Sequence, residues 1–325
     1  MDTSEQASLA ALVAAYCGRP LVRRALGLAE ETTLRATVMH NHLPAPATVP
    51  HDEIHVMQTT HPRYWHYHLE AGNGRQWVAQ FTVGSALGLS SSKQTAYAAR
   101  ALRLVENARI APEVCWVDAT LYHLPYGFLL HEWLSAGAWD WHDPAQITGV
   151  ARALARLHNL PLPVEHGLRV HASPLHAQLE VLERAIAEAG AQTAAAQSWL
   201  AAARTTLVHA ARFAPTALVH GAPERDNWRV QTSTPSPLLA GLGTPQHSFK
   251  LVDWALSCID DPTHDVAAVI AWTTAAERAV PWTAAEQERF VQAYLAARPT
   301  LDAAEFHAKV LLRLPFLRLQ WRVAR

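Results

Sequence analysis

The chain has 325 residues, of which 50% are hydrophobic and 17% are charged. It can therefore bury a real core and is long enough for two compact units. Lys and Arg total 27 against 28 for Asp and Glu. This balance argues against nucleic acid and anionic membranes as partners and favours a small-molecule or protein partner. The cysteines, Cys17, Cys115 and Cys258, are widely spaced and odd in number, so no disulfide framework is predicted.

Residues 1–50 are predicted to form a helical extension followed by a proline-rich linker. Residues 8–16 and 21–29 are rich in Ala and Leu, as short helices are, and HNHLPAPATVP then interrupts regular structure. The chain starts with acidic residues before a short apolar run, and no stretch of about 18 apolar residues follows. We therefore expect no membrane segment and a cytoplasmic location.

Residues 51–130 are predicted to be rich in strands and to contain one long helix. β-Branched and aromatic residues prevail between Glu53 and Phe81, and Asn73-Gly74 separates two strand-like runs, which predicts a tight hairpin. SKQTAYAARALRLVENA then predicts a helix, and PEVCWVDA and LYHLPYGFLLHEWL predict two more strands.

Residues 131–325 are predicted to be mainly helical. Helix starts are marked by an N-cap residue before proline or by a capping box, at Asp143-Pro144, Ser173-Pro174 and Thr283 with Glu286. The second of these helices is expected to bury Leu175, Leu179, Leu182 and Ile186 and to end at Gly190. Two polar passages, ALVHGAPERDNWRV and FKLVDWALSCIDDPTHDVA, interrupt the helices and are the places where chemistry is expected.

These two passages carry a resemblance. HGAPERDN at 220–227 resembles the HGDxxxxN loop of the aminoglycoside phosphotransferases, choline kinases and their relatives. LVDW at 251–254 is similar to that superfamily's second metal site, and DDPTHDVA at 260–267 resembles its GDPxxDLA tail. LARLHNLPLP is similar to the helix end before the catalytic loop, and PYGFLLHEWLSAG resembles the hinge between the lobes.

The resemblance implies an α+β, two-lobed protein-kinase-like fold. A small antiparallel sheet would form the N-lobe at 51–130, and a larger, mainly helical C-lobe at 131–325 would carry both loops. The implied activity is ATP- or GTP-dependent, Mg²⁺-assisted phosphate transfer to the hydroxyl of a small molecule bound in the cleft between the lobes. His131 and Trp133 in the hinge segment would then contact the nucleotide.

The resemblance assigns Asn227 and Asp253 to the two metal-holding positions. An amide and a carboxylate are hard oxygen ligands that suit Mg²⁺. The alternative for Asp253 is that it caps a turn.

The sequence departs from the family's pattern at its catalytic base. Ala222 stands where the family has Asp, and a methyl group cannot deprotonate a hydroxyl. Glu224 and Asp226 are candidate substitutes, but they lie two and four residues away and would need a rearranged backbone. His220 is a third candidate, although the better explanation for it is a buried, hydrogen-bonded histidine beneath the loop.

The phosphate-binding cation is also missing. The strand QWVAQF places Gln80 where the family has Lys or Arg, and Ala98 stands at the position of its acidic partner. The joint loss is physically coherent, because either charge alone would be buried without a partner. The turn at 58–63 has no glycine and contains Pro62, which hinders a close approach of phosphate. Arg63 or Lys93 would supply a charge from elsewhere, or each is a solvated surface residue.

Histidines and tryptophans offer weaker signals. Seven histidines lie between residues 40 and 68: His40, His42, His51, His55, His61, His66 and His68. HDEIH at 51–55 lacks the HExxH spacing, so no metal site is expected there. His66 and His68 alternate with apolar residues as in a half-exposed strand. An aromatic ligand site or simple core packing accounts for the tryptophans Trp133, Trp139, Trp141, Trp228 and Trp254.

Three hypotheses remain open. The first is a catalytically impaired member, a pseudokinase, that binds a ligand or Mg-nucleotide in the interlobe cleft. The second is an active ATP-dependent phosphotransferase that acts on a hydroxyl of an aminoglycoside, choline-like or sugar-like molecule with an unconventional base. The third is that Ala222 is an engineered replacement of Asp, against which Gln80 and Ala98 argue.

Overall fold

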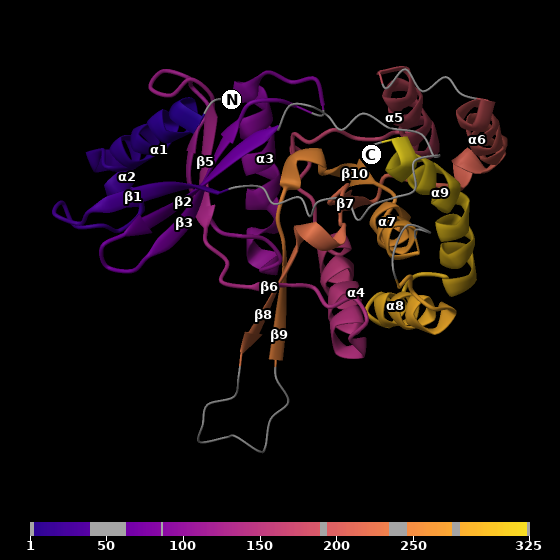
Figure 1. The fold of residues 1–325 in the computed structure, drawn as a ribbon. Coiled ribbons are helices and arrows are strands. Elements are labelled where there is room, and N and C mark those ends of the chain that lie inside the picture. The colour runs from indigo at the N-terminus through magenta and orange to yellow at the C-terminus, as the bar shows by residue number, and fades with distance from the viewer. Residues whose placement is uncertain are drawn as a thin grey trace, which may run out of the picture. The chain divides into compact units, whose positions relative to one another are not determined.

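The computed structural model describes residues 3–39, 63–85, 87–188, 194–233, 246–274 and 280–323. Contacts within the chain define two compact units. The first comprises Met1–Ile54, Thr60–Glu106 and Pro112–Ser135, and the second comprises His55–Thr59, Asn107–Ala111 and Ala136–Arg325. Figure 1 shows the first unit in indigo to magenta and the second mainly in magenta to yellow.

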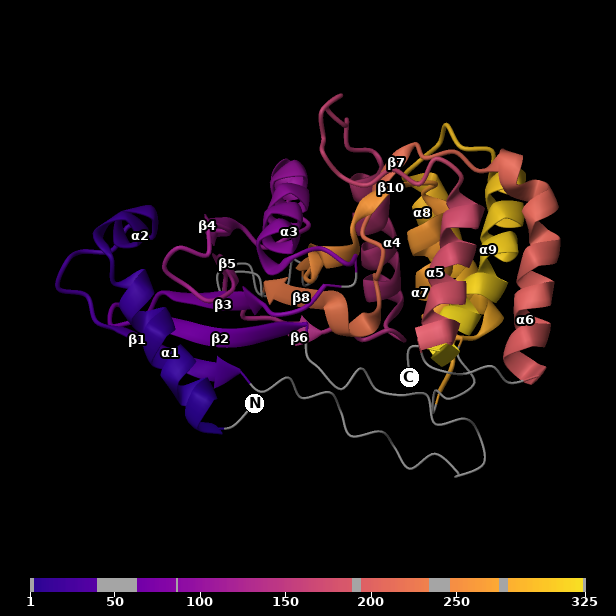
Figure 2. The ribbon, with the colours of Figure 1, turned by 90° about the horizontal axis from the view of Figure 1, so that it is seen from above.

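The first unit is built on a five-stranded antiparallel sheet in the order β1-β2-β3-β5-β4. The strands are β1 (Leu34–Met39), β2 (Tyr64–Ala71), β3 (Gln76–Thr82), β4 (Val114–Asp118) and β5 (Gly127–Glu132). The helices are α1 (Thr3–Cys17), α2 (Pro20–Ala25) and α3 (Ser91–Val105). In Figure 2, α1 lies along one face of the sheet and α3 lies on the other.

The predicted hairpin at Asn73-Gly74 is confirmed. Strand β2 pairs with β3 in the register Glu70↔Gln76. Gly74 has a φ of +83°, which glycine adopts without strain. The predictions of a helix in SKQTAYAARALRLVENA and of two strands after it are confirmed by α3, β4 and β5.

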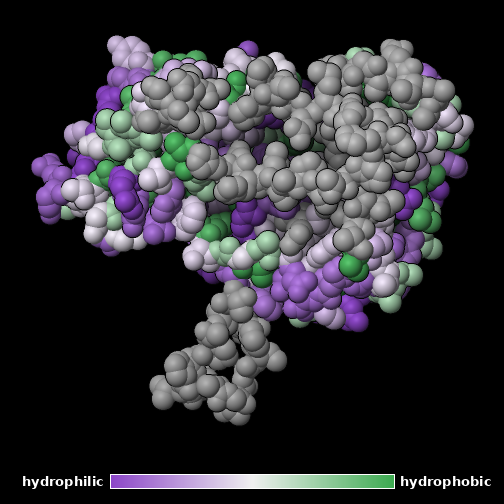
Figure 3. Space-filling view, viewed as in Figure 1, coloured by the Kyte–Doolittle hydropathy of each residue, from purple (hydrophilic) through white to green (hydrophobic). Residues whose placement is uncertain are grey.

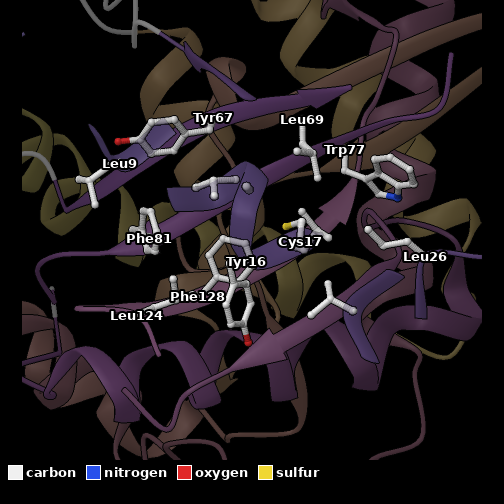
Figure 4. Close-up of a cluster of buried hydrophobic side chains, with 14 of the residues drawn as sticks. Leu9, Tyr16, Cys17, Leu26, Tyr67, Leu69, Trp77, Phe81, Leu124 and Phe128 are labelled. Atoms are coloured by element: carbon white, nitrogen blue, oxygen red, sulfur yellow. The ribbon is translucent and has the colours of Figure 1, made fainter. Parts of the chain in front are cut away.

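The core of the first unit lies between α1 and the sheet. Its fully buried members include Val13 and Cys17 from α1 together with Leu69, Phe81 and Phe128 from the strands. Figure 4 shows Cys17, Leu69, Phe81 and Phe128 within one cluster of buried side chains. The sheet face toward α1 is therefore apolar, and the polar residues of the alternating strands lie on the opposite face.

The N-terminal segment packs within this unit. Strand β1 pairs with β2 from Leu34↔Ala71 to Met39↔His66. Tyr16 on α1 donates a hydrogen bond of 2.6 Å to the Asp118 carboxylate at the end of β4, and Trp116 Nε1 donates to the Tyr16 hydroxyl. The predicted N-terminal extension thus shares the compact unit of the strand-rich region.

The second unit is mainly helical. Its helices are α4 (Pro144–His158), α5 (Pro174–Glu188), α6 (Ala194–Thr205), α7 (Thr263–Thr273), α8 (Ala284–Ala296) and α9 (Ala303–Val323). Its strands are β6 (Gly137–Ala138), β7 (Ala217–Val219), β8 (Trp228–Ser233), β9 (Gln246–Leu251) and β10 (Cys258–Asp260). They form two small sheets, β10-β7 and β6-β8-β9. The mixed α and β composition confirms the predicted fold class.

The predicted helix starts are confirmed. Asp143 accepts a hydrogen bond from the Ala145 N–H at the start of α4, and Thr283 with Glu286 forms a complete capping box at α8. On α5 all four predicted apolar side chains are buried, namely Leu175, Leu179, Leu182 and Ile186. The end expected at Gly190 lies outside the described residues.

The part of the surface that Figure 3 colours is mixed in character. Figure 3 shows hydrophilic residues interspersed with small hydrophobic groups over the coloured part of the face in view. Among the described residues, no helix has the length and apolarity that crossing a membrane requires.

Candidate functional site

The antiparallel pairing of β8 with β9 brings Asn227 and Asp253 to one end of the same sheet. Trp228 pairs with Leu251 as the first pair of the ladder, and beyond it the Val252 N–H donates to the Asn227 carbonyl at 2.9 Å. Asn227 directly precedes β8, and Asp253 follows Val252. The two residues predicted as metal ligands therefore project from adjacent ends of two paired strands.

Asp253 occupies an unusual backbone position. It has φ 64° and ψ 68°, in the left-handed region that Asp tolerates better than most residues. Asp253 is exposed. In the described part of the chain, its side chain makes no capping hydrogen bond to the short 3-10 helix that follows, Trp254–Leu256. The turn-capping explanation for Asp253 thus has no support, and its carboxylate is open to a ligand.

The amide of Asn227 is held in one orientation. Its Nδ2 donates to the Ala222 carbonyl at 2.8 Å and to Glu224 Oε2 at 3.3 Å. These bonds use the NH₂ end of the amide, so the Oδ1 end faces away from both partners. The amide oxygen of Asn227 is therefore not used by these two bonds, and an amide oxygen is a hard ligand that an oxygen-preferring cation accepts.

The loop that follows β7 turns at Gly221. Its φ is +86°, and a Cβ at this position would lie 2.6 Å from the Leu256 carbonyl oxygen. Both the conformation and the close approach require glycine. The loop can therefore pass directly against the segment that follows Asp253.

Asp265 at the start of α7 fastens this loop. Its fully buried carboxylate accepts hydrogen bonds from the His220 N–H at 2.7 Å and from the Gly221 N–H at 3.0 Å. His158 at the end of α4 donates to it from Nε2 at 3.1 Å and accepts from the Tyr294 hydroxyl at 2.7 Å. Burial opposes ionisation, but the hydrogen bonds from His158 and His264 hold the pKa of Asp265 below its usual range.

His220 is fully engaged beneath the loop. Its Nδ1 accepts from the Ala222 N–H at 3.3 Å, and its Nε2 lies 3.0 Å from the Val252 carbonyl, to which it can only donate. The ring packs edge-on against Trp254 with centroids 4.8 Å apart. Burial lowers the pKa of His220, so the ring is neutral and neither nitrogen is free to act as a base.

The carboxylates of the loop differ in environment. Glu224 is half-buried, and its burial, with the negative charges of Asp253 and Asp265 nearby, raises the pKa of its carboxyl to about 7. Asp226 is exposed. Ala222 is half-buried and contributes only its backbone, donating to His220 and accepting from Asn227.

Gln80, His131 and Trp133 belong to the first unit. Gln80 on β3 is flanked by His66 on β2 and Leu129 on β5. His131 is buried, and this lowers its pKa to about 4. Trp133 packs against His68 with ring centroids 4.4 Å apart. Gln80 and Ala98 are both buried, on β3 and α3 respectively, and neither carries a charge.

Several predicted features lie outside the described residues: the turn at 58–62 and the histidines His40, His42, His51, His55 and His61. Arg63 and Lys93 are exposed. Trp139, Trp228 and Trp254 are buried, and Trp139 packs edge-on against Trp228 at 6.4 Å. These three tryptophans therefore serve core packing.

The sequence indicates the residues of the loop, but it does not indicate the hydrogen bonds by which Asp265, His158 and Tyr294 support the loop. His158 and Asp265 lie within segments that resemble the family, but no local pattern assigns either a partner, and nothing marks Tyr294. The bonds of His158 span 107 residues to Asp265 and 136 residues to Tyr294, which no local pattern reveals.

The model of a family described as phosphotransferase enzyme family matches residues 66–307. Among solved structures, a macrolide 2'-phosphotransferase type I is 15% identical with a TM-score of 0.61, covering 99% of this chain and 91% of that chain. The choline kinase LicA from Streptococcus pneumoniae is 16% identical with a TM-score of 0.52 over 79% of this chain and 80% of its own.

A spectinomycin phosphotransferase in complex with ADP and spectinomycin is 10% identical with a TM-score of 0.54, covering 89% of this chain and 80% of its own. At these identities the structural likeness establishes the fold alone. No curated protein sequence matches.

Proposed function

Because the chain belongs to the phosphotransferase enzyme family, we propose that it is a catalytically impaired member that binds a Mg-nucleotide or a related ligand without turning it over. The observation that carries this proposal is Ala222. The family's base position is occupied by a methyl group, and the loop around it is held by Asn227, His220 and Asp265. No proton acceptor stands at that position.

The donor set formed by Asn227 and Asp253 fits a magnesium ion. Both offer hard oxygens from adjacent ends of β8 and β9, and the carboxylate of Asp253 is exposed. When bound there, Mg²⁺ would neutralise charge on nucleotide phosphates. Asn227 and Asp253 would hold the ion, and Glu224 would keep the Asn227 amide oriented through its hydrogen bond.

The cation position supports impairment independently. Gln80 is neutral, as is Ala98, so neither half of the phosphate-binding ion pair is present at these positions. Since phosphoryl transfer depends mainly on positioning and charge stabilisation, loss of the base and the cation together removes two of its main contributions.

The test is an assay of Mg-dependent phosphate transfer from ATP and GTP to aminoglycosides, choline-like and sugar-like alcohols. We expect no turnover by the natural chain. We also expect none from Ala222→Asp alone, because the neutral Gln80 stands at the position where the family carries its phosphate-binding cation. Robust transfer by Ala222→Asp would show that the remainder of the site is complete and would overturn the proposal.

A second candidate is an active phosphotransferase that uses Glu224 as its base. Its support is geometric, since the Glu224 carboxylate lies 3.3 Å from the Asn227 amide. This candidate predicts turnover by the natural chain that is abolished in both Glu224→Gln and Asp253→Ala. The exposed neighbour Asp226 provides the matched control, because Asp226→Asn should retain activity.

A further inference from the structure

Strand β10 presents a thiol and a carboxylate on the same side. Cys258 and Asp260 are two residues apart on an extended strand, so their side chains project in the same direction. Both are buried. On one edge β10 pairs with β7, and on the other it contacts the segment that leads into α5.

That neighbouring segment supplies a histidine. Val170 forms a parallel bridge with Ile259, the Ile259 N–H donates to the Arg169 carbonyl at 2.9 Å, and the His171 N–H donates to the Ile259 carbonyl at 2.9 Å. These backbone bonds fix His171 beside the strand, so its position relative to Cys258 and Asp260 is set by the fold.

The three side chains converge on one small volume. His171 Nδ1 lies 2.7 Å from Asp260 Oδ2 and 3.6 Å from Cys258 Sγ. All three ligand atoms lie within 4.8 Å of one another. This is distinct from the Asn227–Asp253 pair in residues and in chemistry, because it combines a sulfur, a nitrogen and an oxygen.

The arrangement differs from that of a catalytic triad. In a nucleophile–His–Asp triad the nucleophile and the carboxylate contact opposite nitrogens of the imidazole. Here the thiol and the carboxylate both face Nδ1, so the histidine cannot relay a proton between them. A sulfur, a nitrogen and an oxygen that lie within 4.8 Å of one another are instead a donor set that a transition-metal ion can use.

The other oxygen of Asp260 is held separately. Its Oδ1 accepts hydrogen bonds from the Asp261 N–H and from Arg313, a fully buried residue of α9 that also contacts Gln178. The ion pair with Arg313 therefore accounts for the position of Oδ1, whereas Oδ2 is directed at His171. Bonds of this kind orient a ligating carboxylate in many metal sites.

We propose that His171 Nδ1, Cys258 Sγ and Asp260 Oδ2 form a binding site for a thiolate-preferring divalent metal ion, best matched by Zn²⁺. In a tetrahedral zinc site, bond lengths place neighbouring ligand atoms roughly 3.3–3.6 Å apart. The distance between Sγ and Nδ1 already matches. The distance between Nδ1 and Oδ2 must open by less than about 1 Å, as the metal displaces the proton that these two atoms share. The Cys258 thiol also releases its proton to solvent when it binds the metal as a thiolate. The half-buried His171 ring leaves water access for the fourth position.

Cobalt titration of the full chain tests the proposal. Co²⁺ bound through a thiolate gives a sulfur-to-metal charge-transfer band in the near ultraviolet, which oxygen and nitrogen ligands alone do not produce. We expect one equivalent of Co²⁺ to generate the band in the natural chain and Zn²⁺ to displace it. The band should vanish in Cys258→Ala, and affinity should fall at least about tenfold in His171→Ala.

Matched variants separate this site from other binding. Cys115→Ala removes a half-buried thiol of the first unit, and His176→Ala removes a histidine close to His171; both should keep the band. Asp253→Ala should also keep it, so the result does not depend on the proposed magnesium site. If Cys258→Ala does not fold, His171→Ala decides the matter. No band with excess Co²⁺, or a band unchanged in His171→Ala, would overturn the proposal.

Discussion

At residue 221 the chain turns with a φ of +86°, and a side chain there would collide with the Leu256 carbonyl oxygen. The spacing of the His-Gly pair is recognisable in the sequence. The physical reason for the glycine is visible only in the structure, because Leu256 approaches the loop from a distant part of the chain.

Gly221→Ala is expected to lower the free energy of unfolding by about 2 kcal/mol or more, since it combines a left-handed conformation with a backbone clash. Urea unfolding measures the loss. Gly137→Ala is the matched control, because a Cβ added there would meet nothing within 4 Å, and it should be nearly neutral. Equal stability of the two variants would contradict this account of the loop.

His131 makes stability depend on pH. Its burial lowers the pKa from 6.5 to about 4 in the folded chain. The unfolded chain therefore binds more protons between these values, and stability should fall as the pH drops from about 6.5 toward 4.

His131→Gln should flatten this pH dependence. The shift of the His131 pKa lowers the free energy of unfolding by up to about 3 kcal/mol between neutral pH and pH 4. Thermal unfolding at several pH values, with the exposed His123→Gln as control, gives the comparison. If His131→Gln kept the full slope between pH 4 and 6.5, the acid sensitivity would have to arise elsewhere.

At the scale of elements, the sequence predicts those features that depend only on residues close together in the chain. The Asn73-Gly74 hairpin and the capping box at Thr283 depend on residues a few positions apart, and both were predicted. Strand β1 was not predicted, because it is defined by its pairing with β2 across a long proline-rich passage. A strand of this kind has no local signature that specifies its partner.

Tyr16 adds polar contacts to the apolar core that attaches α1 to the sheet. Its hydroxyl donates to the buried Asp118 and accepts from Trp116. Tyr16→Phe should cost about 1–3 kcal/mol, because a buried carboxylate loses a hydrogen-bond donor. The matched control is Tyr122→Phe, which removes the hydroxyl of a side chain that is 83% exposed. Denaturant unfolding should separate the two, and an effect no greater than that of Tyr122→Phe would contradict the anchoring role of Tyr16.

At the scale of the whole molecule, three helices from distant parts of the sequence hold one loop. Tyr294 on α8, His158 on α4 and Asp265 on α7 form a chain of hydrogen bonds that ends on the backbone after β7. The sequence specified the residues of the loop by their spacing. The sequence did not reveal which buried polar groups support the loop, because the packing of the helices determines which of these groups lie close to one another.

The proposed function separates binding from turnover. Hydrogen bonds hold Asn227 and the loop around it, whereas uncharged residues, Ala222, Gln80 and Ala98, stand where the family's catalytic groups are expected. Under this proposal the chain holds a ligand without turning it over.

Thermal unfolding of the chain with ATP or GTP, with and without Mg²⁺, tests that claim most directly. A ligand at one hundred times its Kd stabilises a protein by about 2.7 kcal/mol. We predict a Mg-dependent rise in melting temperature that is lost in Asp253→Ala and kept in Glu165→Ala, which removes an exposed carboxylate elsewhere. No rise at millimolar nucleotide, or a rise unchanged in Asp253→Ala, would contradict a nucleotide site built on Asn227 and Asp253.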